Sequence, residues 1–276
     1  DSLTAADPVV SARAAAIQKQ IDDDYGTVFA KTTYELNGAK APDGNRDGET
    51  NLGDLIADAL VWGARQNGET VDAAVTNGGG IRATVKAGDI TKKDVNTVLP
   101  FGNTLSIVKV TGAELLEALE ASTYCTPDAL GGFPQVSGIV FTVDTTKAYD
   151  AGSLYPDSTY HAPNSIKRVT IQSVGGRAFD AKAVYTIATN DFLAAGGDTY
   201  YAFKAASANY DIGAPMDEVL MDYIRTELKG VVGDTYAKPQ GRITVVKAAA
   251  PAEEPAKPTP PAEETGGDGG ETSYTV

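Results

Sequence analysis

Cysteine and histidine are almost absent from this sequence. Its 276 residues include one of each, Cys125 and His161. A lone cysteine excludes an internal disulfide, and we expect Cys125 to be a small residue of the core. A structural zinc site usually takes four Cys or His ligands. Because these two residues lie in unrelated parts of the sequence, we expect no metal site in this chain.

Positive charge and long apolar runs are also scarce. Lys and Arg number 23 against 37 Asp and Glu, which gives a formal net charge of -14. An acidic surface disfavours extended contact with nucleic acid, although a few local arginines can hold a small anion. No apolar run approaches the roughly 20 residues that cross a bilayer, and no basic-then-apolar leader opens the chain. We therefore expect no nucleic-acid partner, no membrane span and no remaining export signal.

The residues that are present suffice for a sizeable core, because 42% of them are hydrophobic. Composition divides the chain into three parts. Residues 1–29 hold an Ala-rich helical stretch suited to connect with an upstream domain, although a simple packing helix is the alternative. Residues 30–247 are predicted to form the folded domain. Residues 248–276 are rich in Pro, Glu and Gly and predict a disordered linker or stalk.

Helical and strand periodicities both occur within residues 30–247. Apolar residues recur at helical spacing after Asn51 as the N-cap, after a capping box of Thr111 and Glu114, and from Val219 to a terminating Gly230. Five segments typical of β-strands lie between these three predicted helices or after the last of them. They are residues 71–75, 105–110, 139–143, 184–189 and 243–246. The sequence predicts an α+β fold in which helices pack on a mixed sheet.

A glycine-rich loop follows the first predicted strand. It runs from Asn77 through three glycines, the last of them Gly80, to Ile81 and Arg82. Glycines allow a backbone to approach a ligand closely, and an arginine directly after them can present paired donors to a phosphate or carboxylate. A tight turn with a surface arginine explains the same residues about as well.

Two phenylalanines are predicted to lie in loops. Phe101 stands between a proline and a glycine, two residues before Asn103, and Phe192 follows a strand, six residues before Asp198. Two such rings can hold a flat ring between them, and Asp198 can accept hydrogen bonds from vicinal hydroxyl groups. Taken one at a time, each phenylalanine is more commonly a core residue.

Five motifs, taken together and in this order, resemble one known family. They are Arg46 with the sequence ETNLGDL at residues 49–55, NGGGIR at 77–82, LPFGN at 99–103, QVSGI at 135–139 and NDFLAAGGD at 190–198. They closely resemble the C-terminal domain of the 5'-nucleotidases, a family with bacterial UDP-sugar hydrolases, 2',3'-cyclic-nucleotide phosphodiesterases and animal ecto-5'-nucleotidases. The resemblance covers about residues 1–247 and implies the fold of that domain.

The resemblance implies a role for each matching position. Phe101 and Phe192 are expected to hold the base between them, and Asp198 to hold the ribose hydroxyls. Arg46 and Arg82 are expected to bind phosphate. Further contacts are implied for Asn77 at the base edge, for Asn103 at the base, and for close backbone approach at Gly80 and Gly138. No residue of this chain is expected to be catalytic.

The resemblance also implies what lies outside this chain. Family members hydrolyse phosphate esters with two divalent metal ions, which Asp, His and Asn ligands hold in an N-terminal domain. We therefore expect a domain that binds adenosine or AMP, presents the phosphate to that metallophosphatase domain, acts outside the cell, at its surface or in the periplasm, and is inactive alone. Two alternatives stay open: a non-catalytic surface-displayed binding or scaffold module, and motif residues that serve only as turn and core elements.

Overall fold

A computed structural model describes residues 7–247 of the chain. The predicted linker or stalk at residues 248–276 lies outside the described residues, as do residues 1–6 of the expected connector. The helices are α1 (Pro8–Tyr25), α2 (Asn51–Gln66), α3 (Lys92–Val98), α4 (Gly112–Ser122), α5 (Asp191–Ala194), α6 (Tyr201–Lys204) and α7 (Met216–Asp222). The strands are β1 (Val28–Thr32), β2 (Ala73–Asn77), β3 (Gly88–Thr91), β4 (Thr104–Thr111), β5 (Pro134–Ser137), β6 (Ile139–Asp144), β7 (Ala151–Leu154), β8 (His161–Pro163), β9 (Val169–Val174), β10 (Arg177–Ala178), β11 (Val184–Asn190), β12 (Ala208–Pro215), β13 (Val231–Val232) and β14 (Ile243–Val246).

The central sheet has five strands in the order β12-β4-β11-β2-β5. Only the β11–β2 pair is parallel, and its neighbours are antiparallel. A second sheet has the order β10-β9-β6-β14, with β14 parallel to β6. Smaller sheets join β13-β1-β3 and β7-β8. The mixed sheets with helices confirm the predicted α+β fold.

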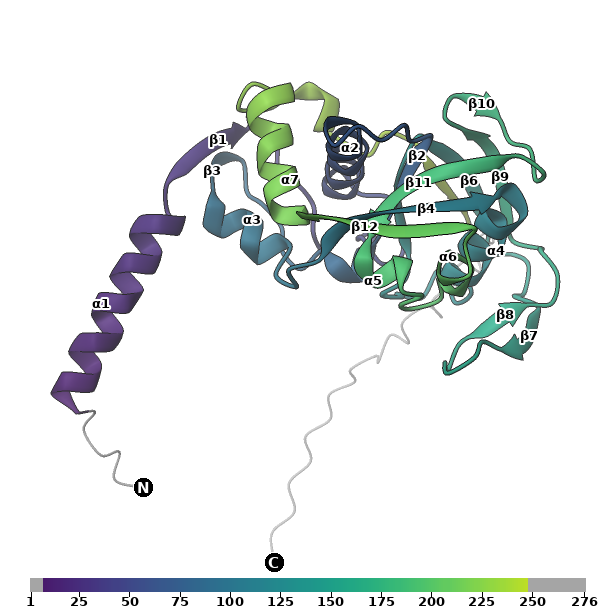
Figure 1. The fold of residues 1–276 in the computed structure, drawn as a ribbon, viewed down its shortest axis with the longest axis horizontal. Coiled ribbons are helices and arrows are strands. Elements are labelled where there is room, and N and C mark those ends of the chain that lie inside the picture. Colours follow the sequence, from purple (N-terminus) through teal and green to yellow (C-terminus); the bar gives the residue numbers. More distant parts are fainter. Residues whose placement is uncertain (1–6, 248–276) are drawn as a thin grey trace, which may run out of the picture.

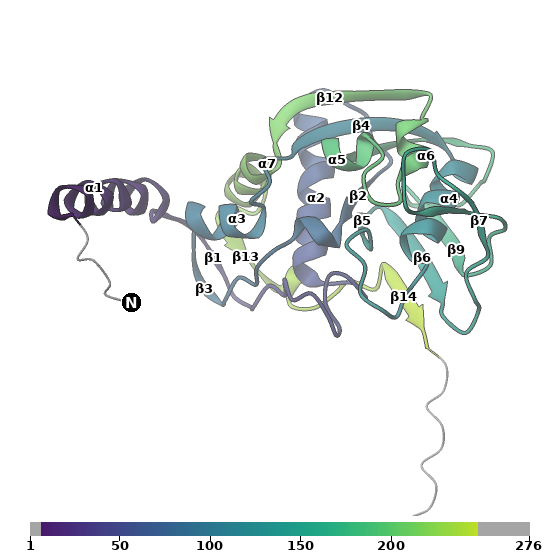
Figure 2. The same ribbon diagram turned by 90° about the horizontal axis from the view of Figure 1, so that it is seen from below.

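Each face of the central sheet packs on a different core. On β4, Leu105 and Ile107 belong to the core shared with α2 and α7, whereas Val108 and Val110 belong to the core shared with α4 and the second sheet. Alternate residues of a strand point to opposite faces, so one strand contributes to both cores. Figures 1 and 2 show α2 and α7 on one side of this sheet and α4, β6 and β9 on the other.

The three predicted amphipathic helices are present as α2, α4 and α7. The predicted capping box at the start of α4 is confirmed, because Thr111 and Glu114 each bond the other's backbone N–H. The N-cap of α2 was predicted one residue too late. Thr50 is the cap, and its side chain accepts a hydrogen bond from Gly53 N at 3.0 Å. The Asn51 amide instead joins α2 to distant backbone. It accepts from Asn37 N and donates to the carbonyls of Glu35 and Tyr236.

The predicted end of the third helix is confirmed. Helix α7 continues as a π-helical turn over Tyr223–Glu227. Gly230 follows it with a left-handed φ of 79°, and its N–H donates to Ile224 O, as predicted for a terminating glycine.

Cys125 was predicted to be a core residue, but it is only half-buried. It lies in the loop after α4, where its thiol contacts Asp128 O at 3.7 Å.

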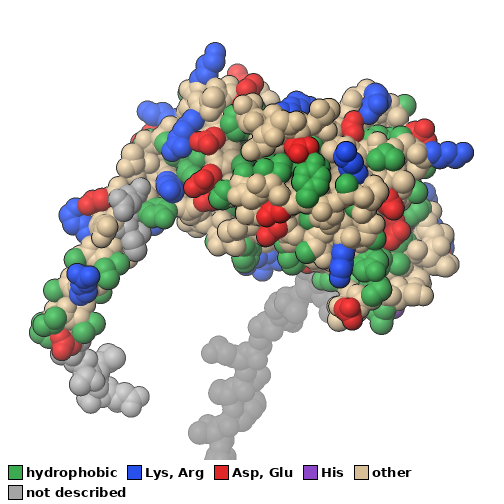
Figure 3. Space-filling model, in the orientation of Figure 1, with side chains coloured by type: hydrophobic (Ala, Val, Ile, Leu, Met, Phe, Trp, Pro, Cys, Tyr) green, Lys and Arg blue, Asp and Glu red, His purple; other side chains and the backbone are tan. Residues whose placement is uncertain are grey.

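Helix α1 stands away from the rest of the domain (Figure 1). Among its described side chains, Val9 is 76% exposed and Ile17 is 48% exposed. On the face drawn in Figure 3, basic and acidic side chains are interspersed, and hydrophobic side chains stand along α1. Among residues 7–247, no helix is long and apolar enough to cross a membrane.

Candidate functional site

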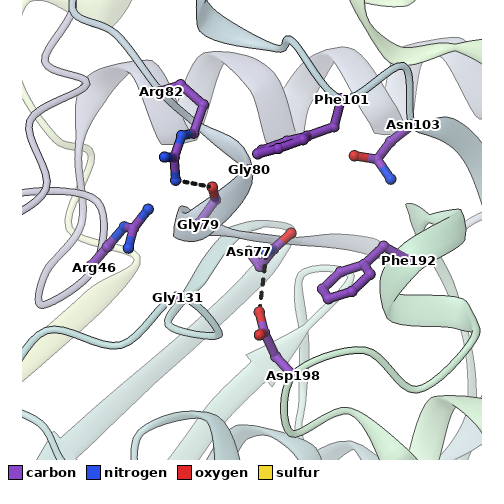
Figure 4. Close-up of a pocket in the computed structure, with 10 residues that line it drawn as sticks. All are labelled: Arg46, Asn77, Gly79, Gly80, Arg82, Phe101, Asn103, Gly131, Phe192 and Asp198. Carbon is purple, nitrogen blue, oxygen red and sulfur yellow. Dashed lines mark hydrogen bonds between the residues drawn. The ribbon is translucent and has the colours of Figure 1, made fainter.

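One pocket contains most of the residues that the motifs predicted. It has a volume of about 350 Å³, which is within the range for small-molecule sites. Eight of the nine predicted residues line it, together with two glycines: Arg46, Asn77, Gly79, Gly80, Arg82, Phe101, Asn103, Gly131, Phe192 and Asp198 (Figure 4). The structure therefore brings together motifs that are up to 152 residues apart.

Strand order explains this convergence. Strands β2 and β11 are adjacent and parallel, so their carboxyl ends, at Asn77 and Asn190, meet at one edge of the sheet. Strand β4 is antiparallel to β11 and begins at the same edge, where Leu105 pairs with Asn190. The loop before β4 carries Phe101 there, while α5 after β11 carries Phe192. Crevices outside the carboxyl ends of strands are common ligand sites.

The two phenylalanines are exposed, and neither is a core residue. Phe101 is 60% exposed and Phe192 is 43% exposed, so the interpretation of these rings as core elements is wrong. Figure 4 shows the two rings on opposite sides of an open gap. Gly197 lies behind Phe192, because a Cβ at that position would be 2.5 Å from the ring. That close packing supports one side of the Phe192 ring.

A chain of buried amides positions Asp198. Asn190 donates to Asn77 Oδ1 at 3.1 Å, and Asn77 donates to Asp198 Oδ2 at 3.2 Å. Burial is the largest influence on the Asp198 carboxyl and raises its pKa, while the Asn77 bond and the Arg46 charge lower it. Asp198 has a left-handed φ of 51°, which is uncommon outside glycine. The predicted contact of Asn77 with a base edge stays a prediction, since its amide is here bonded to Asp198.

Arg46 and Arg82 lie on the same side of the pocket (Figure 4). Burial lowers the pKa of Arg46, and the Arg82 charge lowers it further, whereas Asp198 opposes both. Arg82 donates to Gly79 O at 3.2 Å, and its guanidinium carbon is 5.5 Å from the Phe101 ring centre. Among the described residues neither arginine forms an ion pair with a carboxylate. Two neighbouring guanidinium groups that form no direct ion pair favour an anion.

The glycine-rich loop packs closely against the backbone of neighbouring loops. Gly78 has no room for a side chain, because a Cβ there would be 1.7 Å from Asn45 O. Gly79 N donates to Gly131 O at 2.7 Å. A Cβ at Gly80 would meet only the Asn77 side chain, at 3.4 Å, so its absence leaves the pocket open at this position.

Asn103 is held by a residue that the motif interpretation did not single out. Its Nδ2 donates to Asp191 Oδ1 at 2.6 Å, and the same carboxylate accepts from the backbone N–H of Thr104 and Phe192. Asp191 thus connects the loop before β4 to the start of α5. The Asn103 amide oxygen points toward the gap between the rings (Figure 4).

Gly138 is the one predicted site residue that does not line this pocket. It forms the turn between β5 and β6 with a φ of 73°, and a Cβ there would be 2.7 Å from Asp72 O. That contact is at the start of β2, whereas the pocket is at its end. The expected ligand approach at Gly138 stays a prediction, because this residue lies outside the pocket. Gly131, which does line the pocket, had only the adjacent Gly131-Gly132 pair as a sequence signal.

No metal cluster accompanies the pocket within the described part of the chain. Groups of three or more His, Cys, Asp or Glu side chains able to hold a metal are absent from residues 7–247. His161 lies on β8, where its Nδ1 is 2.8 Å from Gly152 O. Asp198, the carboxylate that lines the pocket, accepts a hydrogen bond from the Asn77 amide, and Asp191 accepts one from the Asn103 amide.

A part-aromatic, part-cationic pocket at the strand ends of an α+β domain has the features of a small-molecule site. The profile of the family described as "5'-nucleotidase, C-terminal domain" matches residues 28–205. The chain belongs to this family.

Similar proteins agree with that assignment. The chain is 33% identical over 246 residues to the trifunctional nucleotide phosphoesterase protein YfkN of Bacillus subtilis, covering 89% of this chain and 16% of that protein. It is 28% identical over 248 residues to the snake venom 5'-nucleotidase of Macrovipera lebetinus, covering 86% of this chain and 57% of the venom protein. Among solved structures, the 5'-nucleotidase precursor of Thermus thermophilus has a TM-score of 0.71 at 32% identity, covering 86% of this chain and 43% of that one.

Proposed function

We propose that this chain is the nucleotide-recognition domain of a 5'-nucleotidase-type phosphohydrolase and that it binds nucleosides and nucleotides of the adenosine or AMP type. The observation that carries the proposal is the pair of exposed rings, Phe101 and Phe192, on opposite sides of one open pocket (Figure 4). A flat base between them removes apolar surface from water on both of its faces. The Asn103 oxygen beside the gap can accept a hydrogen bond from the base.

The polar groups support the proposal by their order along the pocket. In Figure 4 Arg46 and Arg82 lie on one side of the pocket, with Arg82 next to Phe101, while Phe192 lies on the other side and Asp198 lies below and between them. A carboxylate accepts hydrogen bonds from vicinal ribose hydroxyls, and the paired guanidinium groups bind phosphate. Base, ribose and phosphate therefore each have a partner in the order in which they are linked.

Hydrolysis takes place, in this proposal, with a second domain. The chain spans less than two thirds of the relatives and solved structures it matches, and the family resemblance implies an N-terminal metallophosphatase domain. Two divalent metal ions bound there would activate water and stabilise the departing oxygen. The role of this chain is to hold the nucleoside and to present its phosphate through Arg46 and Arg82.

We further propose an extracellular, cell-surface or periplasmic location. One relative is a venom protein and one solved neighbour is a precursor, which supports a protein that acts outside the cytoplasm. The alternative is a surface-displayed module that binds nucleotides without taking part in hydrolysis. AMP hydrolysis by the full-length protein that falls in a Phe192→Ala variant supports the catalytic role, whereas unchanged hydrolysis in that variant supports the non-catalytic module.

Calorimetric titration of the purified chain tests the proposed ligand. Adenosine should bind, and AMP should bind more tightly because it adds contacts to both arginines. Ribose 5-phosphate, which lacks a base, should bind far more weakly than AMP. The proposal fails if the folded chain binds neither adenosine nor AMP, or if ribose 5-phosphate binds as well as AMP.

A further inference from the structure

Two carboxylates bind one backbone N–H group at the point where the chain enters its last described strand. Gln240 N donates to Glu49 Oε1 at 2.9 Å and to Asp54 Oδ2 at 3.0 Å. Glu49 also accepts a hydrogen bond from Ile243 N, through Oε2 at 2.9 Å. Glu49 lies just before α2, and Asp54 lies in the first turn of that helix. The pair therefore connects the start of α2 to the backbone at the start of β14.

Positive charge around this pair is scarce. The Arg242 guanidinium group is 3.6 Å from Asp54 Oδ1, but it is also 2.8 Å from Asp58 Oδ2. Tyr236 donates its hydroxyl proton to the same Asp58 oxygen at 2.9 Å. One guanidinium group thus serves three carboxylates.

The other charged side chains near Glu49 do not correct this imbalance. They line a depression beside it and supply three acidic and two basic groups, so they add no net positive charge. These side chains are Glu35, Asp43, Asp47, Lys238 and Lys247.

Burial disfavours the ionised form of Asp54. This side chain is fully buried, whereas Glu49 is partly exposed. In the described part of the chain, Asp54 Oδ1 has no hydrogen-bond partner, and an ionised carboxylate with an unpartnered buried oxygen is costly. Burial raises the pKa of the Asp54 carboxyl to about 8, the Glu49 charge acts in the same direction, and Arg242 opposes both. Two carboxyl groups that interact this closely titrate as a unit.

We propose that Glu49 and Asp54 share one proton and act as a proton-dependent latch, which holds the start of β14 against α2 and loosens when alkaline pH removes the proton. With the proton in place, the two carboxyl groups do not repel each other, and both accept from Gln240 N. Without it, two negative charges face one N–H group, and Arg242 compensates only in part because Asp58 also binds it. The latch controls the attachment of the C-terminal strand and does not involve the nucleotide pocket.

The pH dependence of stability follows from the raised pKa. In an unfolded chain an aspartate ionises near pH ~3.9, whereas Asp54 in the folded chain ionises at about pH 8. A group whose pKa is higher in the folded state stabilises the fold fully at low pH, and that stabilisation is lost as pH rises through the folded value. One retained proton makes the unfolding equilibrium constant rise about tenfold per pH unit until the folded pair has ionised.

Urea unfolding of the chain and of its Asp54→Asn variant at pH 6 and pH 9 tests the shared proton. Asparagine has the shape of a protonated aspartate and cannot ionise, so the variant lacks this pH dependence. The unfolding constant of the wild type, divided by that of the variant, should increase at least about tenfold from pH 6 to pH 9. A ratio that is equal at the two pH values would refute the latch.

Asp211→Asn is the matched control for this comparison. Asp211 also accepts a backbone hydrogen bond, from Gly213 N at 2.9 Å, but its side chain is exposed. The unfolding constant of the wild type, divided by that of Asp211→Asn, should be the same at pH 6 and pH 9, since an exposed aspartate is ionised at both.

Hydrogen exchange distinguishes a latch from a general effect on stability. At pH 9, residues 240–246 should exchange faster in the wild type than in Asp54→Asn. They should also exchange faster than β4 in the wild type itself, because the strand opens while the rest of the domain stays folded. Exchange of residues 240–246 no faster than that of β4 would show that the segment opens only when the whole domain unfolds, and would overturn the latch.

Glu49→Gln tests the second member of the pair and decides the question if Asp54→Asn does not fold. Removal of the Glu49 charge lowers the pKa of the Asp54 carboxyl. The loss of stability with rising pH should therefore end at a lower pH in Glu49→Gln than in the wild type. The same pH dependence in both proteins would show that the two carboxyl groups do not share a proton.

Discussion

The proposed binding of a base between Phe101 and Phe192, here called the aromatic clamp, makes the sharpest prediction, because it separates ligand binding from fold stability at two defined rings. Substitution of Phe101 or Phe192 by alanine removes one stacking face from a bound base. Stacking of a base on an aromatic side chain contributes ~1–3 kcal/mol, so adenosine binding should weaken about 5- to 150-fold. In Phe192→Ala, AMP should lose a similar factor, whereas Phe101→Ala should weaken AMP binding at least as much as adenosine binding, because Arg82 lies over the Phe101 ring.

The effect on stability follows from exposure. Truncation of a fully buried phenylalanine costs ~3–5 kcal/mol. Phe101 is 60% exposed and Phe192 is 43% exposed, so scaling that cost by the buried fraction gives ~1–2 kcal/mol for Phe101 and ~2–3 kcal/mol for Phe192. Phe192 should cost more than Phe101 because its ring packs on Gly197.

Calorimetric titration with thermal melts of each variant tests both effects. Phe203, which is fully buried, is the matched control, and Phe203→Ala should lower the melting temperature most while the folded fraction still binds adenosine. Leucine variants at positions 101 and 192 test the stacking itself, because they keep apolar volume but present no flat face. Normal adenosine binding by Phe101→Ala and Phe192→Ala would refute the clamp, as would melting as low as that of Phe203→Ala.

Three further predictions concern the polar end of the pocket and its chemistry. Arg46→Ala should weaken AMP binding about 10- to 150-fold, because a hydrogen bond to a charged group contributes ~1.5–3 kcal/mol. Adenosine binding should change little. Equal losses in titrations of both ligands would exclude a phosphate contact. Because burial raises the pKa of the Asp198 carboxyl, its ionised form should be lost at a higher pH than in an exposed aspartate. Adenosine affinity, titrated across acidic pH, should therefore fall as pH decreases through that pKa, and Asp198→Asn should abolish the dependence. The chain alone should release no phosphate from AMP with added Mn²⁺ or Zn²⁺, and activity that copurifies with the chain would contradict the assigned roles.

Local sequence patterns predicted the main elements because they depend on neighbouring residues. The capping box of Thr111 and Glu114 is a four-residue signal, and it begins α4 where predicted. The strand predicted at residues 243–246 has those bounds. The N-cap of α2 was misassigned because Asn51 is a favourable cap by residue type. Its amide is used by Asn37, Glu35 and Tyr236, the last being 185 residues away, and no local pattern contains that contact.

The supporting residues of the pocket were harder to predict for the same reason. Phe101, Phe192 and the arginines stand out in the sequence because of their residue types and adjacent glycines. Asp191 and Asn190 appear as ordinary residues at the end of a strand, and their partners Asn103 and Asn77 are 88 and 113 residues away. Gly138 carries a left-handed φ in the turn between β5 and β6, and it lies outside the pocket that the other predicted residues line.

The parallel pairing of β2 with β11 is the feature on which the site depends most. Asn77 ends β2 and Asn190 ends β11, and their hydrogen bond places Asp198 and Phe192 beside the glycine-rich loop. A one-residue slip of β11 against β2 would turn the Asn190 amide to the opposite face of the sheet from Asn77 and would separate Phe192 and Asp198 from the glycine-rich loop. Phe192 and Asp198 follow β11, whereas Arg82 follows β2. A single strand pair therefore sets the spacing between the expected positions of base, ribose and phosphate, and recognition of a whole nucleotide requires the two halves in that register.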